Sequence, residues 1–226
     1  MAGAPADEGA MLELGLKILL SYLLGSLSGS LITGRFYGGI DVREVGSGNA
    51  GATNALRNFG WKFAFWVVLI DVAKGWLPAW LLPGLALPGI GLDAELSRAW
   101  LAAACGAAAV VGHVWPLWFG FKGGKGAATL VGVLLALAPW LLVPVLSVWI
   151  LTLILSGYVG LATVSAALSA PAALVLTGTA ARSPELFAFA LVMSLFVVYT
   201  HRSNLRRMHA GTEERIDRVR VFHGRR

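Results

Sequence analysis

Residues 126–156 read GAATLVGVLLALAPWLLVPVLSVWILTLILS, and this apolar run decides the fold. A helix needs roughly 20 apolar residues to cross the hydrocarbon of a bilayer, so the run is too long for one span and too short for two ordinary ones. Pro139 and Pro144 lie near its middle, and a proline interrupts a helix. Whether the run crosses once or twice determines which side of the membrane receives the rest of the chain.

The rest of the chain is also apolar. Of its 226 residues 57% are hydrophobic and only 13% are charged, and the mean hydropathy is +0.73. This composition favours a bilayer over water as the solvent. Further stretches suited to membrane helices are residues 12–34, 63–83, 98–112, 158–181 and 185–200. We therefore expect an all-α membrane protein.

Lysine and arginine give the orientation, because cytoplasmic loops are enriched in both. Most of the 18 basic residues follow the first, third and last expected spans, while acidic residues gather at the opposite ends. If residues 126–156 crossed once, the arginine-rich C-terminal tail would lie outside, against this rule. The pattern predicts seven transmembrane helices, the fourth and fifth short and joined near Pro139, with the N-terminus outside and the C-terminus in the cytoplasm.

The chain has no long repeat or linker, so we expect a single integral-membrane domain, residues 1–226, with flexible tails at residues 1–11 and 216–226. The first residues are acidic where a secretory signal would be basic, so no cleaved peptide is expected. Cys105 is the one cysteine of the sequence, which rules out an intramolecular disulfide.

Four residues inside the expected spans call for a structural interpretation. Gly25 and Gly29 are expected to let helix backbones approach closely. Asp71 and Lys74 are three residues apart on one helical face, so we expect them to neutralise each other inside the second span.

Three polar segments interrupt the apolar sequence. We call residues 46–57 (GSGNAGATNALR) the first, residues 112–129 (GHVWPLWFGFKGGKGAAT) the second and residues 201–215 (HRSNLRRMHAGTEER) the third polar segment. On the predicted topology all three face the cytoplasm, so they can share one site. Glycine-rich backbone offers N–H groups to anions, helix N-termini add a positive dipole end, and Arg57 and Lys125 add full charges. These features favour binding of a phosphate group.

Several other sites are disfavoured. The second segment departs from the nucleoside-triphosphate loop, because Phe119 and Gly126 stand where glycine and serine or threonine are required. The histidines are scattered without metal-ligand spacing, and no serine lies in a nucleophile elbow. His113 fits a helix-ending role and a functional role equally well. His201 begins a denser polar cluster, and a function as general base or phosphate donor is favoured there.

Together, the three segments resemble the bacterial integral-membrane acyl-phosphate:glycerol-3-phosphate acyltransferases. That family carries GSGN-x-GATN followed by an arginine, then GH-x-x-P-x-x-x-x-FKGGKG-x-AT, and then H-x-x-N-x-x-R followed by a glycine and a glutamate. The resemblance covers residues 25–215. It implies seven spans in the bacterial inner membrane and an active site that faces the cytoplasm.

The resemblance also implies a reaction: transfer of a fatty acyl group from acyl phosphate to the 1-hydroxyl of glycerol 3-phosphate, without a covalent enzyme intermediate. The products are lysophosphatidic acid and inorganic phosphate, in the first acylation of phospholipid synthesis. It implies that the protein uses no cofactor or metal and binds no nucleic acid. It also implies that membrane lipid surrounds the protein. The proton acceptor is either His201 or an oxygen of the acyl phosphate itself.

Site residues follow by the same resemblance. Catalysis is assigned to Ser47, Arg57, Lys125 and His201, and substrate binding to Gly48, Asn49, Gly51, Thr53, Asn54, Gly123, Gly124, Thr163, Asn204, Arg207 and Glu214. One departure concerns Gly160 and Thr163, where the family is expected to carry two serines. Only Thr163 keeps a hydroxyl.

Two rival functions fit parts of the pattern. A transporter for an organic phosphate would need a polar path to the outer face, yet the outer loop at residues 84–97 carries no basic cluster. A purely structural membrane anchor leaves three polar segments on one side unexplained.

Overall fold

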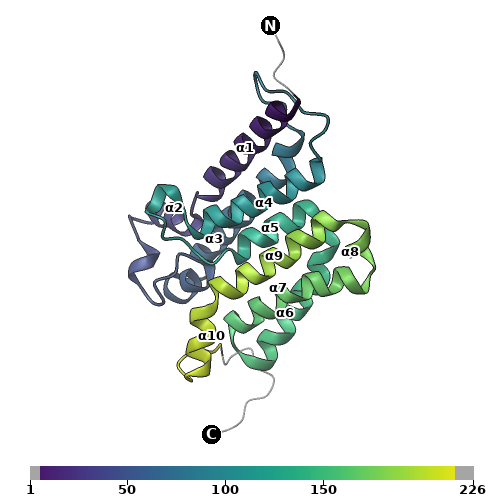
Figure 1. Ribbon diagram of the computed structural model, residues 1–226. Helices are drawn as coiled ribbons and strands as arrows, with labels where there is room; N and C mark the ends of the chain where they lie inside the picture. The colour runs from purple at the N-terminus through teal and green to yellow at the C-terminus, as the bar shows by residue number, and fades with distance from the viewer. Residues whose placement is uncertain (1–5, 217–226) are drawn as a thin grey trace. The chain divides into compact units, whose positions relative to one another are not determined.

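The computed structural model describes residues 6–216. Within them the chain forms helices joined by loops (Figure 1), with one isolated bridge between Leu87 and Gly91 and no strand. The expected all-α class is confirmed. The chain forms two compact units, Met1–Leu137 and Ala138–Arg226, which are described separately below. The single domain stays a prediction. Residues 6–11, expected in a tail, are helical, and residues 217–226 of the second tail lie outside the described residues.

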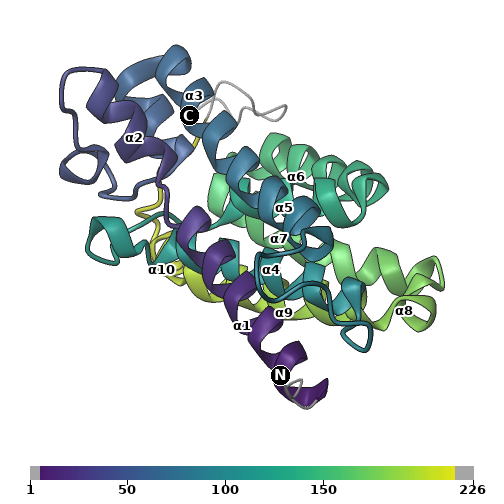
Figure 2. The ribbon, with the colours of Figure 1, turned by 90° about the horizontal axis from the view of Figure 1, so that it is seen from above.

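The first unit holds five α-helices: α1 (Ala6–Gly25), α2 (Gly29–Phe36), α3 (Ala52–Leu81), α4 (Arg98–Val114) and α5 (Ala127–Leu137). Helix α1 lies along α4, as the two views in Figure 1 and Figure 2 show, and α3 packs against α5. Glycines make these contacts close, because a Cβ at Gly25 would overlap the backbone of Ala109 and a Cβ at Gly132 would overlap the carbonyl of Val72.

The first expected span is bent by 44° between α1 and α2. At this break the Lys74 ammonium donates to the carbonyl of Leu27 at 2.8 Å, and the Gly29 N–H donates to Asp71 Oδ1 at 3.1 Å. Lys74 Nζ lies 2.9 Å from the same Asp71 oxygen, so the expected pair is confirmed. The pair satisfies backbone groups that a broken helix would leave without partners in hydrocarbon. A Cβ at Gly29 would lie 2.7 Å from the Val67 carbonyl, which confirms the expected close approach.

A kink divides α3 at Gly60, whose φ of 81° and ψ of 179° are not helical. Glycine tolerates this positive φ without a steric cost. The kink separates the polar start of α3, which belongs to the first polar segment, from the apolar part that matches the expected span at residues 63–83.

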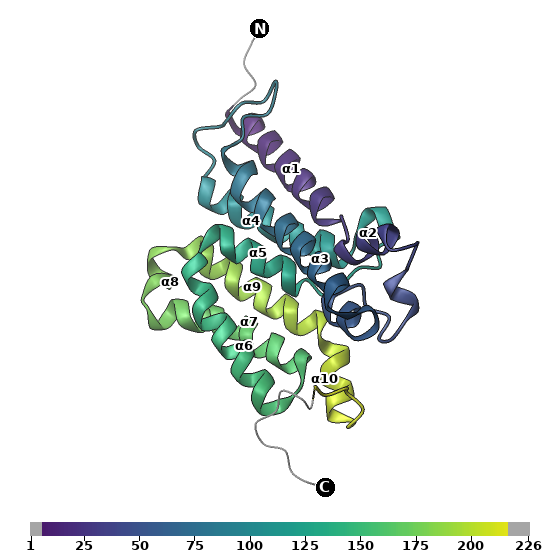
Figure 3. The ribbon, with the colours of Figure 1, turned by 180° about the vertical axis from the view of Figure 1, so that it is seen from behind.

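The second unit holds α6 (Leu142–Ser156), α7 (Val159–Leu176), α8 (Thr179–Arg182), α9 (Pro184–Thr200) and α10 (Arg202–His209). Helix α7 packs against both α6 and α9, which can be followed in Figure 3. The buried Ser194 hydroxyl in α9 lies 2.5 Å from the Ala167 carbonyl of α7 and 2.7 Å from the Ala190 carbonyl of its own helix.

The decisive run breaks as expected. Helix α5 ends at Leu137, Pro139–Leu141 forms a 3₁₀ turn, and α6 follows. Within the described residues four helices are long and apolar enough to cross a membrane, or six if each bent pair is one span. The 11-residue α5 is shorter, so the count of seven requires it to cross as well. That count, and the orientation of the termini, stay predictions.

A buried ionic cluster at the start of α1 was not predicted. The side chains of Glu13 and Lys17 are both fully buried and lie 2.6 Å apart, and Glu13 also pairs with Arg98 of α4. The Arg98 guanidinium donates to the carbonyls of Pro83 and Asp93 at 2.9 and 2.8 Å. These charges hold the loop between α3 and α4 onto α1, in addition to any role in membrane orientation.

Candidate functional site

The first polar segment wraps around one side chain, Asn54. Its Nδ2 donates to the carbonyls of Val42 and Val45 at 2.9 and 3.0 Å, and its Oδ1 accepts from the Ser47 N–H at 3.1 Å. Asn54 is only 3% exposed. Its amide thus fixes the loop that precedes α3, and a direct contact with substrate stays a prediction.

Glycine allows this loop to close. Gly46 has a φ of 57°, and a Cβ there would lie 2.5 Å from both Asn54 Oδ1 and Asn58 Nδ2. Gly51 precedes the first residue of α3, where no side chain caps the helix. The initial N–H groups of a helix lack partners within it and form a common setting for anions. Ser47 and Gly48 are exposed beside this helix start.

The other expected residues of this segment surround the same helix start. Asn49 and Thr53 are half-buried, and a Cβ at Gly51 would lie 2.7 Å from the Asn49 amide nitrogen. Arg57 is exposed in the next turn of α3. The structure therefore brings the predicted polar side chains of this segment together on one loop and its following helical turns.

Arg43, which the sequence analysis did not select, joins the first and second segments. Its guanidinium binds the Asp41 carboxylate, with Nη2 2.7 Å from Oδ2, and donates to the Phe119 and Lys122 carbonyls at 2.8 and 3.3 Å. The hydrogen bond from Arg43 lowers the pKa of Asp41 below its ordinary value of 3.8. The Asp-x-Arg spacing just before residue 46 is the signal that could have identified this link.

Residues 122–126, which we call the lysine loop, fold back onto the end of α4. The Gly123 and Gly124 N–H groups donate to the carbonyls of Val114 and His113, both at 3.2 Å. A Cβ at Gly124 would lie 2.9 Å from the Ala50 carbonyl and would overlap the His113 ring. The first and second polar segments therefore meet at Gly124, where only glycine fits.

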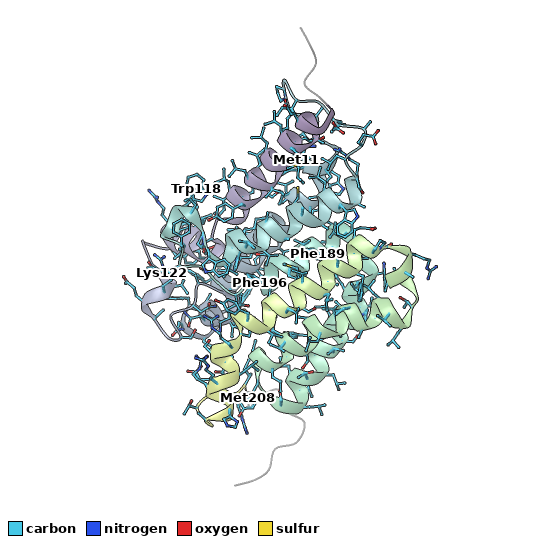
Figure 4. All side chains as sticks on the ribbon, in the orientation of Figure 1. Met11, Trp118, Lys122, Phe189, Phe196 and Met208 are labelled. Carbon is cyan, nitrogen blue, oxygen red and sulfur yellow. The ribbon has the colours of Figure 1, made fainter. Side chains whose placement is uncertain are left out.

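The two lysines of this loop differ in exposure. Lys125 is half-buried two residues before the start of α5, whereas Lys122 is exposed, as its labelled side chain in Figure 4 shows. The half-buried lysine is the one that the sequence analysis selected.

The third polar segment belongs to the second unit, and a carboxylate holds its side chains. Asn204 Nδ2 donates to Glu213 Oε1 at 2.6 Å and Arg207 Nε donates to Glu213 Oε2 at 2.7 Å. Glu213 was not selected, because neighbouring glutamates look alike in a sequence. The selected Glu214 is exposed, and its role stays a prediction.

His201 is buried at the junction of α9 and α10, only 5% exposed. Its Nδ1 lies 2.9 Å from the Val197 carbonyl. A carbonyl oxygen can only accept, so Nδ1 carries the proton. In the neutral ring Nε2 is then the basic nitrogen.

Gly160, where the family is expected to carry a serine, packs against the Asn204 side chain. A Cβ there would lie 2.7 Å from Asn204 Cβ, so glycine makes room for the asparagine. The Thr163 hydroxyl donates to the Val159 carbonyl at 2.9 Å and accepts from Trp149 Nε1 at 3.2 Å. Its hydrogen bonds are made within the second unit, and its contact with substrate stays a prediction.

Within residues 6–216, no group of three or more His, Cys, Asp and Glu side chains is arranged to hold a metal ion. Besides the carboxylates of Asp41 and Glu213, which bind Arg43 and side chains of the third polar segment, the polar segments offer glycine-shaped backbone, amides, hydroxyls and cations. Such groups suit anionic oxygens.

Comparison with known proteins places these features in a family. Residues 15–211 match the family model described as glycerol-3-phosphate acyltransferase. Proteins named glycerol-3-phosphate acyltransferase include one from Chlorobaculum tepidum, 36% identical over 220 residues, which cover 88% of this chain and 94% of that protein. Another, from a Synechococcus species, is 41% identical over 201 residues, with 89% and 94% covered.

Solved structures are also similar. A crystal structure of PlsY (YgiH), an integral membrane glycerol 3-phosphate acyltransferase in its glycerol 3-phosphate form, aligns with a TM-score of 0.76 and 33% identity and covers 90% of this chain and 95% of that one. The lysophosphatidic acid form of the same protein aligns with a TM-score of 0.75 and 32% identity, over 89% and 94% of the two chains.

Proposed function

This chain belongs to the glycerol-3-phosphate acyltransferase family, and we propose that it transfers a fatty acyl group from acyl phosphate to the 1-hydroxyl of glycerol 3-phosphate. The similar solved structures of PlsY in its glycerol 3-phosphate and lysophosphatidic acid forms support the acceptor and the product. The acyl phosphate donor is proposed from the motif resemblance of the three polar segments.

The proposed step is a direct displacement. The 1-hydroxyl oxygen attacks the acyl carbonyl carbon, the bond from that carbon to the phosphate oxygen breaks, and inorganic phosphate leaves. The hydroxyl proton passes to His201 or to an oxygen of the leaving phosphate. Acyl phosphate is an activated donor, so no covalent enzyme intermediate is needed.

The observation that carries the proposal is the joining of the first and second polar segments within the first unit. Arg43 and the contact at Gly124 fix the α3 start beside the lysine loop. Two phosphate-bearing substrates need anion-binding groups close to one acyl carbon. Holding two reactants in attack geometry lowers a barrier by about 7–11 kcal/mol in ideal intramolecular cases.

Roles within the first unit follow from position. Ser47, Asn49 and Thr53 would bind phosphate oxygens and support the developing oxyanion. The N–H groups of Gly48 and Gly51, which were expected to join them, donate in this structure to the carbonyls of Val45 and Asn49 at 3.1 and 2.9 Å. Lys125 and Arg57 would neutralise phosphate charge. Gly123 and Gly124 would let the lysine-loop backbone approach the substrate closely. Asn54 fixes the other loop, which precedes α3, through the carbonyls of Val42 and Val45.

The third polar segment would orient glycerol 3-phosphate through His201, Asn204 and Arg207, and Glu214 would help to fix the arginine side chains of the segment. Glu213 holds Asn204 and Arg207 in place. His201 with its proton on Nδ1 would present a basic Nε2, which is compatible with a role as proton acceptor.

The family and the apolar helices fit a bilayer setting. We propose the bacterial inner membrane as the location, with the site facing the cytoplasm. There, a water-soluble glycerol 3-phosphate reaches the loops while the acyl chain of the donor remains in lipid.

Donor choice is the direct test. Purified protein in lipid receives labelled glycerol 3-phosphate with palmitoyl phosphate, palmitoyl-CoA or palmitoyl-acyl carrier protein in separate reactions. The proposal predicts lysophosphatidic acid and an equal amount of inorganic phosphate with palmitoyl phosphate alone. Product from either thioester at the same rate would refute the proposed donor. Uptake of labelled glycerol 3-phosphate into sealed vesicles without ester formation would favour a transporter instead.

A further inference from the structure

His113 lies in the last turn of α4, buried between a carboxylate and the lysine loop. Its side chain is 4% exposed, and Nδ1 lies 3.4 Å from Asp71 Oδ1. Nδ1 has no partner with hydrogen-bond geometry in the part of the chain that the structure describes, so the carboxylate is the charged group that it faces. The 3.4 Å approach of the carboxylate favours the tautomer with its proton on Nδ1, because a proton there is attracted to the negative charge. The charge of Asp71 therefore orients the ring without a well-formed hydrogen bond.

The opposite edge of the ring abuts the lysine loop. A Cβ at Gly124 would overlap His113 Nε2 and would lie 2.9 Å from Cε1. The main-chain carbonyl of His113 also accepts the Gly124 N–H at 3.2 Å. His113 therefore contacts the same loop residue through its ring and through its backbone, and a displaced ring would move Gly124.

Asp71 has further partners that keep it in place. Lys74 Nζ lies 2.9 Å away and the Gly29 N–H donates to it at 3.1 Å, while Lys74 also donates to the Leu27 carbonyl. The carboxylate is thus held by groups from α3 and from the break between α1 and α2. The hydrogen bonds to Asp71 and Lys74 therefore keep the carboxylate fixed beside the His113 ring.

We propose that Asp71 and His113 are positioning residues that hold the lysine loop in its binding conformation. Asp71 fixes the His113 ring, and the ring fixes Gly124 beside Ala50. The structural part of this proposal concerns the first unit alone, and its kinetic consequence rests on the proposed function.

Steady-state kinetics of three His113 variants test the predicted effect on substrate binding. His113→Ala should raise KM for glycerol 3-phosphate about tenfold and change kcat less than about threefold, as expected for a displaced hydrogen-bonding loop. His113→Gln places an amide near Nε2 and should recover most of the KM. His113→Asn reaches only toward Asp71 and should recover less. Equal recovery by both amides, or an unchanged KM in His113→Ala, would show that the ring does not position the loop.

Hydrogen exchange tests the geometry without activity. The lysine-loop peptide containing Gly123 and Gly124 should exchange faster in His113→Ala and in Asp71→Asn than in the wild type. Glu13→Gln is the matched control, because it removes a buried carboxylate charge of the same unit that contacts Lys17 and Arg98 instead. It should lower thermal stability while leaving exchange in the lysine loop and KM unchanged.

The outcomes separate the two proposals. An unchanged exchange rate in His113→Ala, or the same increase in Glu13→Gln, would overturn the positioning role. A wild-type protein that makes no lysophosphatidic acid would refute the proposed function, and the exchange result would still decide whether His113 and Asp71 hold the loop. If His113→Ala does not fold, His113→Gln and Asp71→Asn carry the comparison.

Discussion

The first and third polar segments hold their functional groups in different ways. In the first, the amide of Asn54 binds the loop backbone, and the side chains packed around Gly46 leave no room for a Cβ at that position. In the third, the carboxylate of Glu213 binds two side chains, Asn204 and Arg207. The conformation of the first segment should therefore be sensitive to loss of the Asn54 amide and to any side chain added at Gly46. A cluster held by a carboxylate should respond to a change of charge.

The largest effect on activity is expected at the lysine loop, which contacts the first polar segment. Lys125→Ala should lower kcat/KM by about a thousandfold, because a missing charge at a phosphate or a developing oxyanion costs about 10²–10³ in rate per group. Lys122→Ala is the matched control, since its exposed side chain lies three residues away, and it should retain activity within about twofold. Equal losses in both variants would remove the distinction between the two lysines.

A somewhat smaller effect is expected at Asn54. Asn54→Ala should lower kcat/KM about a hundredfold and lower the melting temperature, because buried backbone groups of Val42, Val45 and Ser47 lose their partner at about 1–3 kcal/mol each. Asn58→Ala is the comparison, because the exposed Asn58 amide donates only to the Asn54 carbonyl and to Asn54 Oδ1, and its loss should cost less than that of Asn54. Steady-state rates and thermal melts measure both. Full activity in Asn54→Ala would contradict a loop held by this amide.

The carboxylate of the third segment should matter less. Glu213→Gln keeps an oxygen for Asn204 but removes the charge that faces Arg207. We expect KM for glycerol 3-phosphate to rise about tenfold with little change in kcat, because a partly exposed charged hydrogen bond contributes only about 1–2 kcal/mol. The Arg207 side chain is 41% exposed. A decrease as large as that in Asn54→Ala would remove the contrast between the two segments.

Gly160→Ser tests the departure from the family pattern. The new Cβ would stand 2.7 Å from Asn204 Cβ, so Asn204 must shift. We expect kcat/KM to fall about fivefold, equivalent to about 1 kcal/mol of overpacking. Gly160→Ala supplies the comparison, since it adds the same Cβ without a hydroxyl. A rise in activity with serine alone would mean that the hydroxyl contributes to the site.

The smallest effect is expected at Asp41. Arg43 lowers the pKa of Asp41 below 3.8 in the folded protein, so its stabilising contribution is complete above pH 3.8 and is lost as pH falls through the folded pKa. Asp41→Asn should lower stability by less than about 1 kcal/mol at pH 7, since the carboxylate is 30% exposed. Melting curves should converge with those of the wild type at acidic pH. A difference that grows on acidification would contradict the sign.

The sequence predicted what depends on composition and local spacing. Apolar length predicted the helices, and the three-residue spacing predicted the Asp71–Lys74 pair. The prolines predicted the break after Leu137. These features need only neighbouring residues, because helix geometry relates them directly.

Other features depend on residues far apart in the chain and were missed. The break between α1 and α2 is stabilised by Lys74 from α3, and Glu13 is paired with Arg98 from α4. Arg43 contacts a carbonyl at Phe119. No periodicity encodes such contacts. Within the candidate site, the sequence selected the polar segments, whose function stays a prediction, whereas the residues that fasten two of them together became visible only in the fold.

The central claim is that the first and second polar segments together bind the phosphate groups of the two substrates, that of glycerol 3-phosphate included. Hydrogen exchange of the wild-type protein with and without glycerol 3-phosphate tests it most directly, with glycerol as the uncharged control. We predict slower exchange in peptides covering residues 46–57 and 114–126 with glycerol 3-phosphate, and no change with glycerol. Protection confined to the loop at residues 84–97, or none in the two segments at saturating substrate, would contradict the account.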